Sequence, residues 1–197
     1  VQRVDEHNVF VDIGKVEAKL SRMDQIESEH YEVHDRIKVF VTKVANTGRG
    51  PQVSISRSHP GLLKRLFEME VPEIYDGIVE VKSISREAGE RSKISVYASN
   101  PEVDPVGSCV GPKGQRVQAV VDELNGEKID IVEWSEDPVV YVSNALSPSE
   151  VVDVLVNEEE KATTVIVPDD QLSLAIGKRG QNARLAAKLT GWKIDIK

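Results

Sequence analysis

Cysteine and long apolar runs are nearly absent from this chain, and each absence excludes a class of protein. The one cysteine, Cys109, rules out an internal disulfide framework and fits a reducing compartment, so we expect a cytoplasmic protein. No apolar stretch approaches the roughly 20 residues that a membrane helix needs, so we expect no membrane span. The chain also lacks an initial methionine and a signal peptide, and we expect a piece of a longer protein.

An excess of basic residues is missing as well. The chain carries 25 Lys and Arg against 33 Asp and Glu, a net charge of −8. Taken alone, that balance argues against nucleic-acid binding. The charges are segregated, however, because residues 24–35 hold five acids and no Lys or Arg, whereas residues 173–197 hold six basic residues and one acid, Asp195. Since local potential decides where a polyanion docks, the C-terminal part remains a candidate site for one.

The first 58 residues have the pattern of short strands and turns. Apolar and polar residues alternate at period two over 9–12 and again over 37–44. A Gly-rich turn at 48–50 precedes a third strand-like segment at 53–56. Short strands joined by one longer polar connection predict a small β-barrel over residues 1–58.

The character of the chain changes near residue 59. Ser58 or His59 can cap a helix that has Pro60 in its first turn, and Pro72 sits just beyond the expected end of that helix. Four apolar residues give the helix one face to bury: Leu62, Leu63, Leu66 and Phe67. We therefore expect a domain boundary at this point.

The rest of the chain contains an internal repeat. The segment 110–115, Val-Gly-Pro-Lys-Gly-Gln, recurs at 176–181 as Ile-Gly-Lys-Arg-Gly-Gln. A helix is expected after each copy, ending at a glycine suited to a left-handed C-cap, Gly126 or Gly191. Each copy then runs into a strand with the sequence Lys-Ile-Asp-Ile.

The repeat extends upstream of both copies. A helix is expected over 138–146, in the position that the helix after residue 59 occupies in the first copy. Two strand-like segments then precede each copy: 78–86 and 92–98 in the first, 152–156 and 163–167 in the second. Two units, 59–137 and 138–197, are therefore predicted, each with the order α-β-β-α-α-β.

A Gly-x-x-Gly turn at this place suits phosphate binding. Glycine at both ends removes Cβ atoms, so a sugar-phosphate chain can approach the main chain closely. The turn also opens a helix, whose first N–H groups favour an anion. Lys113 in the first turn, and Lys178 with Arg179 in the second, add positive charge. The alternative is a helix-turn-helix that needs glycine only to turn tightly, and two copies with basic central residues favour the phosphate hypothesis.

These motifs resemble known RNA-binding modules. The α-β-β-α-α-β order with its GxxG turn is similar to the type II KH fold, a three-stranded sheet with helices on one face, whose turn clamps the backbone of single-stranded RNA. Residues 8–14 and 53–57, Asn-Val-Phe-Val-Asp-Ile-Gly and Val-Ser-Ile-Ser-Arg, resemble an S1 domain, which is an OB-fold barrel. We expect a multidomain α+β chain with a partial S1-like barrel (1–58), a first KH unit (59–137) and a second KH unit (138–197).

The order S1, KH, KH resembles the NusA family of bacterial transcription factors, as does the segment 104–111, Asp-Pro-Val-Gly-Ser-Cys-Val-Gly, before the first turn. This resemblance implies a protein without enzymatic activity, cofactor or metal that binds single-stranded RNA, the nascent transcript. It also implies that RNA polymerase is a partner, mainly through an N-terminal domain outside this chain, with other transcription factors as further candidates. The implied function is control of pausing, termination and antitermination.

The resemblance also implies which residues contact RNA. In the two turns they are Gly111, Pro112, Lys113, Gly114, Gly177, Lys178, Arg179 and Gly180, and on the following helices Gln115, Arg116, Gln181, Asn182 and Arg184. S1 domains present aromatic residues on their binding face, and here Phe10 alone clearly matches, because the region of Ser21 and Arg22 has no aromatic residue. The first strand of the barrel is also expected to be missing at Val1. We therefore predict weaker RNA binding by the barrel than by the KH units.

Other conspicuous residues have simpler explanations. Cys109 corresponds to Ala175 in the repeat, so we interpret it as a small packing residue rather than a nucleophile. Trp134 and Trp192 sit at strand ends of the two repeats and are interpreted as packing residues at a domain interface, with base stacking as the alternative. The acidic turn 158–160 is expected to be a solvated loop, or else a screen that keeps RNA away from one face.

Two other functions compete with an RNA-binding module of a transcription factor. The chain could be the RNA-tethering part of a processing enzyme such as a phosphorolytic exoribonuclease, but such enzymes usually carry one KH unit before S1, whereas here S1 comes first and KH is doubled. It could also be a protein-interaction scaffold whose KH folds have lost RNA binding. The basic turns argue against the scaffold, and the acidic net charge argues for it.

Overall fold

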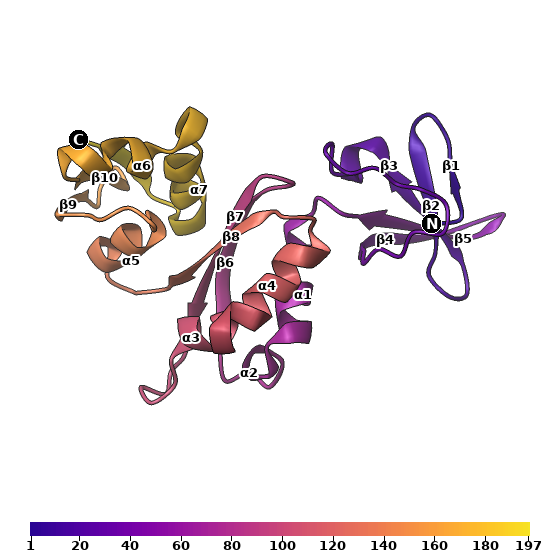
Figure 1. The fold of residues 1–197 in the computed structure, drawn as a ribbon, viewed down its shortest axis with the longest axis horizontal. Coiled ribbons are helices and arrows are strands. Elements are labelled where there is room, and N and C mark those ends of the chain that lie inside the picture. Colours follow the sequence, from indigo (N-terminus) through magenta and orange to yellow (C-terminus); the bar gives the residue numbers. More distant parts are fainter.

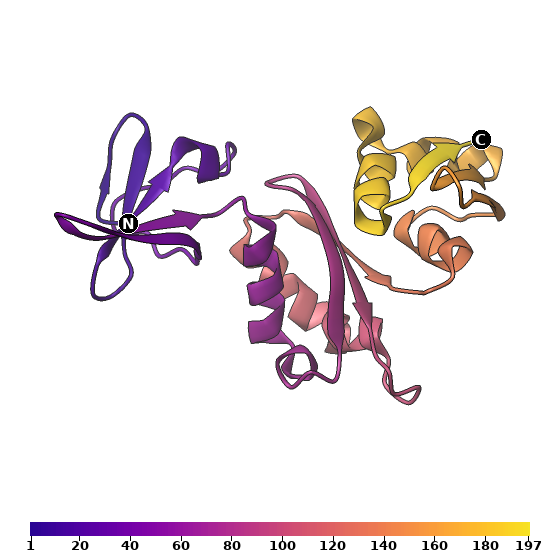
Figure 2. The same ribbon diagram turned by 180° about the vertical axis from the view of Figure 1, so that it is seen from behind.

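Three separate hydrophobic cores lie in a row in the computed structural model, which describes residues 1–197 (Figure 1). The barrel, which holds the N-terminus, lies at one end and the first KH unit lies in the middle. The second KH unit, which holds the C-terminus, lies at the other end (Figure 2). None of the helices has both the length and the apolar composition that a membrane span requires.

One mixed sheet of five strands forms the barrel: β1 (Arg3–Val4), β2 (Asn8–Asp12), β3 (Glu17–Ser21), β4 (Phe40–Thr47) and β5 (Gly50–Ser56). The strand order is β1-β2-β3-β5-β4, with β3 and β5 parallel and the other neighbours antiparallel. Val9, Val11, Leu20 and Ile55 point inward and are almost fully buried. Their alternation with outward residues follows from the two-residue period of a strand.

The barrel differs from the sequence prediction in three details. The sequence does not predict β3, because its only buried apolar residues, Ala18 and Leu20, give a weak alternation. β4 begins at Phe40 rather than at residue 37. The prediction that the first strand is missing is wrong, since β1 pairs with β2, although β1 is only two residues long.

The first KH unit has the predicted order: α1 (Pro60–Glu70) with the short α2 (Pro72–Tyr75), β6 (Glu80–Glu87), β7 (Arg91–Tyr97), α3 (Pro105–Val110), α4 (Gln115–Glu123) and β8 (Lys128–Glu133). β7 is the central strand, antiparallel to β6 and parallel to β8. The helices pack on one face of this sheet around a core that includes Phe67, Ile94, Cys109 and Val120. This arrangement confirms the predicted type II KH topology.

Local sequence explains how α1 begins and ends. The Nδ1 atom of His59 accepts a hydrogen bond from the backbone N–H of Gly61 at 2.8 Å, so His59 rather than Ser58 is the N-cap. Pro60 occupies the first turn, where a helix does not use the missing N–H. Pro72 cannot continue α1 and instead opens α2.

The second KH unit repeats the first: α5 (Pro138–Ala145), β9 (Asp153–Asn157), β10 (Ala162–Ile166), α6 (Leu172–Ile176), α7 (Gln181–Thr190) and β11 (Lys193–Ile196). β10 is central, antiparallel to β9 and parallel to β11. Cys109 and Ala175 are both fully buried at equivalent positions. The predicted repeat and the packing role of Cys109 are therefore confirmed.

The two long repeat helices end differently. Gly191 caps α7 in the left-handed conformation at φ 76°, as predicted. α4 ends two positions earlier than predicted, with Leu124 as C-cap and Asn125 in the left-handed conformation at φ 54°. Gly126 lies one residue further on, where its N–H bonds the carbonyl of Val121. The prediction of Gly126 as C-cap is wrong because asparagine also tolerates the left-handed position.

The second KH unit packs on the first through α7. This helix lies against β6 and β7, on the face of their sheet that the first unit's own helices leave free (Figure 1). Ser85 Oγ donates a buried hydrogen bond to the carbonyl of Leu185 at 2.8 Å, and Tyr141 donates to Ser95 Oγ at 2.8 Å. The two units therefore share a specific interface and are not joined by a linker alone.

A buried arginine joins the barrel to the first KH unit. Arg57 is 1% exposed, and its guanidinium donates to both carboxylate oxygens of Glu29 at 3.0 and 2.6 Å. It also donates to the Glu123 carboxylate at 3.0 Å and to the carbonyls of Lys38 and Glu123. Every N–H of the side chain is used, so the position of the barrel on the KH unit is defined by directional bonds.

Candidate nucleic-acid interface

The two GxxG turns have the same backbone conformation. The N–H of Gly114 bonds the carbonyl of Gly111 at 3.1 Å, and the N–H of Gly180 bonds that of Gly177 at 3.1 Å. Positive φ angles recur at the same positions: 77°, 54° and 73° at Gly111, Lys113 and Gly114, and 81°, 57° and 73° at Gly177, Arg179 and Gly180. The two copies of the sequence repeat therefore have the same backbone geometry. Both turns lie at the surface.

The glycines of a turn meet different constraints. A Cβ atom on Gly177 would lie 2.7 Å from the backbone nitrogen of Asn182, so the first glycine allows the turn to close on its helix. A Cβ atom on Gly180 would meet nothing within 4 Å. The last glycine therefore leaves its backbone open to an incoming chain and supplies the left-handed φ.

Positive charge is concentrated at the exposed tips of both turns. Lys113, Lys178 and Arg179 are all exposed, and no side chain caps the start of α4 or α7. Lys113 and Arg179 hold a left-handed φ, which is unfavourable for a non-glycine residue and clusters at functional sites. These two basic residues are therefore presented in a fixed, strained position at a helix N-terminus that favours an anion.

The neighbouring predicted residues are close to the turns but not equally accessible. Pro112 is exposed and takes the place of Lys178, so the first turn has one basic residue where the second has two. Gln115 is exposed and Gln181 is half-buried, each at the first position of its helix. Both glutamines therefore directly follow the last glycine of a turn.

Asn182 and Arg116 brace the turns from inside. Asn182 is 3% exposed, and its amide donates to the carbonyls of Leu146 and Ala175, each at 3.0 Å. The sequence predicts an RNA contact for Asn182, whereas the structure places its side chain beneath the turn. Arg116, its equivalent, is half-buried and donates through Nη1 to the Glu73 carboxylate and the Ser108 carbonyl.

The side chain of Arg184 is hydrogen-bonded to the first KH unit. Its Nε and Nη2 atoms donate to the carboxylate of Glu87 at 3.1 and 2.6 Å, and this hydrogen bonding lowers the pKa of Glu87. Nη1 donates to the carbonyl of Arg179 at 3.0 Å. Arg184 therefore ties the second turn to the first KH unit, whereas the sequence predicts a direct RNA contact.

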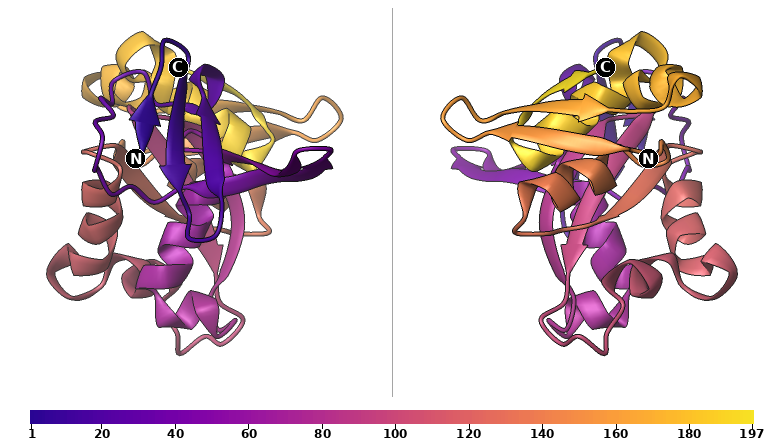
Figure 3. Two further views of the ribbon diagram at one scale, coloured as in Figure 1. Left: turned by 90° about the vertical axis from the view of Figure 1, so that its right-hand side faces the viewer. Right: turned by 90° about the vertical axis from the view of Figure 1, so that its left-hand side faces the viewer.

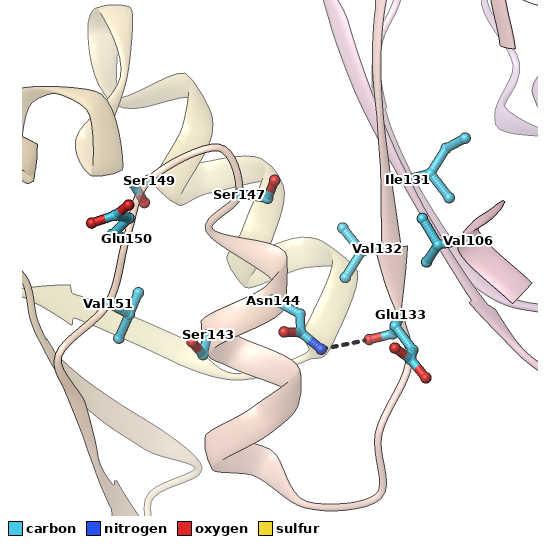
Figure 4. A pocket seen from close by; sticks show the side chains of 10 residues that line it. All are labelled: Val106, Ile131, Val132, Glu133, Ser143, Asn144, Ser147, Ser149, Glu150 and Val151. Carbon is cyan, nitrogen blue, oxygen red and sulfur yellow. Dashed lines mark hydrogen bonds between the residues drawn. The ribbon is translucent and has the colours of Figure 1, made fainter. Parts of the chain in front are cut away.

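A groove of about 580 Å³ separates the sheet edge of the first KH unit from α5 (Figure 4). Val106, Ile131 and Val132 form its wall on the first unit, and the segment after α5 forms the other wall. Asn144 donates to the carbonyl of Glu133 at 3.2 Å across the groove. The carboxylates of Glu133 and Glu150 both line it, so this groove is acidic at its rim.

A second groove, of about 290 Å³, lies between the second turn and the first KH unit. Gly177, Lys178 and Gln181 line one side, and Arg91 and Lys128 line the other. Glu90 is the one acidic residue in its lining. This groove places three basic side chains from both KH units around one space.

The barrel offers a smaller basic surface. Phe10 lies on the outer side of β2, with the Arg3 guanidinium 3.8 Å from its ring centre and Lys19 opposite it on β3. Arg3 is also paired with Glu17 at 2.9 Å. The ring face that a base would need is thus shared with an arginine of the same sheet.

The tryptophans and the cysteine lie within the packing. Trp134 makes edge contacts with Tyr97 of the first KH unit and Tyr141 of the second, at 5.2 and 6.3 Å between ring centres. Trp192 packs against the core of the second unit. Burial raises the pKa of the Cys109 thiol to about 12, which does not suit a nucleophile.

Comparison with known families matches all but three residues of the chain, in three parts. Residues 57–134 match the NusA-like first KH domain, and residues 138–197 match the NusA-like second KH domain. Residues 1–56 match the S1 RNA binding domain. The chain belongs to the NusA family. The resemblance inferred from the GxxG turns and the S1-KH-KH order is therefore confirmed.

Several curated NusA proteins are similar along the full length of the chain. Each is called transcription termination/antitermination protein NusA, with 73% identity in Bacillus subtilis, 74% in Halalkalibacterium halodurans and 52% in Thermus thermophilus. The alignments cover 100% of this chain and 53%, 52% and 51% of those proteins. The chain thus spans about half the length of the NusA proteins it matches.

Proposed function

We propose that this chain binds single-stranded RNA without catalysis, and that both GxxG turns hold phosphates of the RNA backbone. The observation that carries this proposal is the pair of turns with equal backbone conformation. Each turn exposes basic side chains at a helix start that no protein side chain caps. A polyanion with regularly spaced phosphates matches two such cradles on one molecule.

The grooves between the turns suggest how one strand passes from the first KH unit to the second. The groove at Glu133 and Glu150 repels phosphate but accepts hydrogen bonds from the amino groups of bases. The groove at Arg91, Lys128 and Lys178 suits a phosphate. A continuous strand would place bases in the first groove and backbone in the second.

The biological role follows from the family and is part of the same proposal. Relatives are named for transcription termination and antitermination, so we propose that the RNA is a nascent transcript in the cytoplasm. RNA polymerase and other transcription factors are the proposed protein partners. Family membership gives no support to the exoribonuclease alternative, because the S1-KH-KH order is that of NusA.

Charge reversal at the second turn tests the proposal. The double variant Lys178→Asp, Arg179→Asp should weaken binding of a fluorescent single-stranded RNA by about 100-fold, because two charge-assisted contacts of about 1.5 kcal/mol each are lost. Both side chains are exposed, so the fold should be unchanged. Anisotropy titration measures the affinity, and circular dichroism checks the fold.

A matched control comes from α1. Lys64 and Arg65 are adjacent, exposed and helical, so Lys64→Asp, Arg65→Asp makes the same change of charge away from the turns. The control should retain nearly the full affinity. Equal affinity of the turn variant and the wild type would exclude the second turn as a phosphate site and favour the scaffold alternative.

A further inference from the structure

The two KH sheets differ in what covers their outer faces, meaning the faces away from their own helices. The outer face of the first sheet is covered by α7 of the second KH unit. The outer face of the second sheet, formed by β9, β10 and β11, lies at the end of the molecule and faces the viewer in Figure 3 (right). The outer face of the KH sheet is therefore covered by a helix in the first unit and uncovered in the second.

Strand register fixes which residues are equivalent on the two faces. Lys93 lies opposite Asp130 in the first sheet, as Thr164 lies opposite Asp195 in the second. The pairing of β6 with β7, and of β9 with β10, extends this equivalence to the other residues of the outer faces. Named first-sheet residue first, the equivalent pairs are Ser85 and Leu155, Ser95 and Ile166, and Glu87 and Asn157. The comparison between the faces is therefore made residue by residue.

The covered face shows how a helix is held. Ser85 bonds the carbonyl of Leu185 in the middle of α7, and Ser95 bonds Tyr141 of α5. At the end of β6, the carboxylate of Glu87 holds the guanidinium of Arg184 at 2.6 Å. Two serines beside the buried Lys93–Asp130 ion pair, and an acidic hairpin end, thus receive an amphipathic helix that carries an arginine.

The uncovered face of the second sheet is more apolar at its centre than the covered face of the first sheet. Leu155 is 54% exposed where the first unit has Ser85, and Ile166 is 37% exposed where the first unit has Ser95. Covering these two aliphatic side chains removes more apolar area from water than covering the serines does.

The acidic end of the hairpin is also stronger on the free face. The turn between β9 and β10 carries Glu158, Glu159 and Glu160, all exposed, and one basic residue, Lys161. On β11, Asp195 lies between Lys193 and Lys197 on the same face and is 4.0 Å from Lys197, so the charges of that strand largely balance. The excess of negative charge is therefore at the hairpin turn, which favours a basic residue of the partner there.

We propose that the outer face of β9–β11 is a docking surface for an amphipathic helix of another protein. The helix presents aliphatic side chains to Leu155 and Ile166, and an Arg or Lys to the turn at Glu158–Glu160. The three carboxylates of this turn repel phosphates, so the occupant of this end of the face is a protein helix and not RNA. The surface is separate from the GxxG turns, so protein and RNA can be held at the same time.

The probe is a labelled, hydrocarbon-stapled peptide with the sequence of α7 and its C-cap, Gln181–Gly191, since that helix covers the equivalent face of the first unit. The peptide should bind the intact chain in a saturable anisotropy titration. Leu155→Asp should weaken binding at least about tenfold, and Glu158→Lys with Glu160→Lys should weaken it and reduce its dependence on salt. Leu155→Ser, which introduces the first unit's residue, should have an intermediate effect.

Val44→Asp is the matched control, because Val44 is 63% exposed on β4 of the barrel. It should bind the peptide like the wild type. Absence of saturable binding, or equal binding by Leu155→Asp, overturns the proposal. So does a wild-type dimer in sedimentation that Leu155→Asp dissociates, since the occupant is then a second copy. A loss of RNA affinity in Leu155→Asp beyond that of Val44→Asp overturns it too, because the face then belongs to the RNA path.

Discussion

At the residue scale, the two glycines of a GxxG turn are required for different physical reasons. Gly177 combines φ 81° and ψ 168°, a region that is almost restricted to glycine, with the close approach of the Asn182 backbone. Gly180 has φ 73° in the left-handed helical region and open space around it. The first glycine therefore supports the fold, and the second mainly keeps the backbone accessible to a ligand.

Alanine substitutions separate these roles. Gly177→Ala should destabilise the chain by about 3 kcal/mol or more, because strain adds to a collision with backbone that cannot move cheaply. Gly180→Ala should cost about 1 kcal/mol, since only the left-handed φ is penalised. Urea unfolding measures both changes in the free energy of unfolding. Equal destabilisation by the two substitutions would contradict this assignment.

The sequence predicts where the turn residues lie, but not which groups the bracing residues contact. Glycine spacing and basic residues identify Lys113, Lys178 and Arg179, because an exposed turn depends on local sequence. Asn182 and Arg184 lie in the same helix and look equally able to reach RNA. Their true partners, Leu146 and Glu87, come from distant parts of the chain, and no local pattern records them.

At the element scale, a buried ion cluster joins β7, β8 and the segment after α5. Lys93 is fully buried and donates to Asp130 at 2.9 Å and to the carbonyl of Ser147 at 2.7 Å. Arg91 makes two hydrogen bonds to the same carboxylate. Burial alone would raise the pKa of Asp130, but hydrogen bonds from Arg91 and the nearby Lys93 hold it below its usual range.

Asp130→Asn should destabilise the chain by about 3 kcal/mol at neutral pH, because Lys93 is left buried without its counter-charge. A carboxylate with a lowered pKa stabilises the fold above the unfolded-state value near 4, and this contribution is lost as the pH falls further. The difference between wild type and variant should therefore shrink below about pH 4. Denaturant titrations at pH 7 and at pH 3 to 4 measure it.

The matched control is Asp195→Asn, the equivalent position in the second sheet. Asp195 is exposed and lies 4.0 Å from Lys197, so its substitution should change the free energy of unfolding by less than about 0.5 kcal/mol. If both substitutions lowered the free energy of unfolding by a similar amount, the buried cluster would contribute no more to stability than an exposed aspartate does.

Elements with a strong internal pattern are the ones that the sequence predicts. The hairpins and GxxG helices recur twice, and each has clear alternation or a buried stripe. β3 escapes prediction because its buried residues are only Ala18 and Leu20, and its place in the sheet comes from pairing with β2 and β5. The sequence also does not fix the end of α4, because Asn125 and Gly126 can both adopt the left-handed conformation.

At the scale of the whole molecule, the position of the barrel depends on Arg57. The sequence shows an arginine at the end of a strand but not that Glu29 and Glu123, distant in the chain, converge on it. Likewise, the repeat predicts two KH units but not that α7 of one covers the sheet of the other. Relative placement of domains arises from contacts between complementary surfaces, which local periodicity does not encode.

Replacement of Arg57 should loosen the barrel. Arg57→Met keeps a long side chain but leaves Glu29, whose side chain is 4% exposed, without its counter-charge, so we expect a loss of about 3–5 kcal/mol. The barrel should also move relative to the first KH unit, raising the radius of gyration in small-angle scattering. Arg65→Met, which removes an exposed ion pair on α1, should change neither by a measurable amount.

The salt dependence of RNA binding reports whether the molecule acts as one phosphate-binding surface. If both turns and the second groove neutralise about four to six phosphates, log K should fall with log salt at a slope near −3 to −4, since each phosphate on a single strand contributes about −0.7. Lys178→Asp with Arg179→Asp should lower the magnitude of the slope by about 1.4, the share of two phosphates.

A slope near zero in the wild-type chain would contradict phosphate binding by the turns. A steep slope that the double variant leaves unchanged would instead place the contacts on the barrel and the first turn. The size of the change therefore distinguishes a continuous RNA path over both KH units from a local site on one of them.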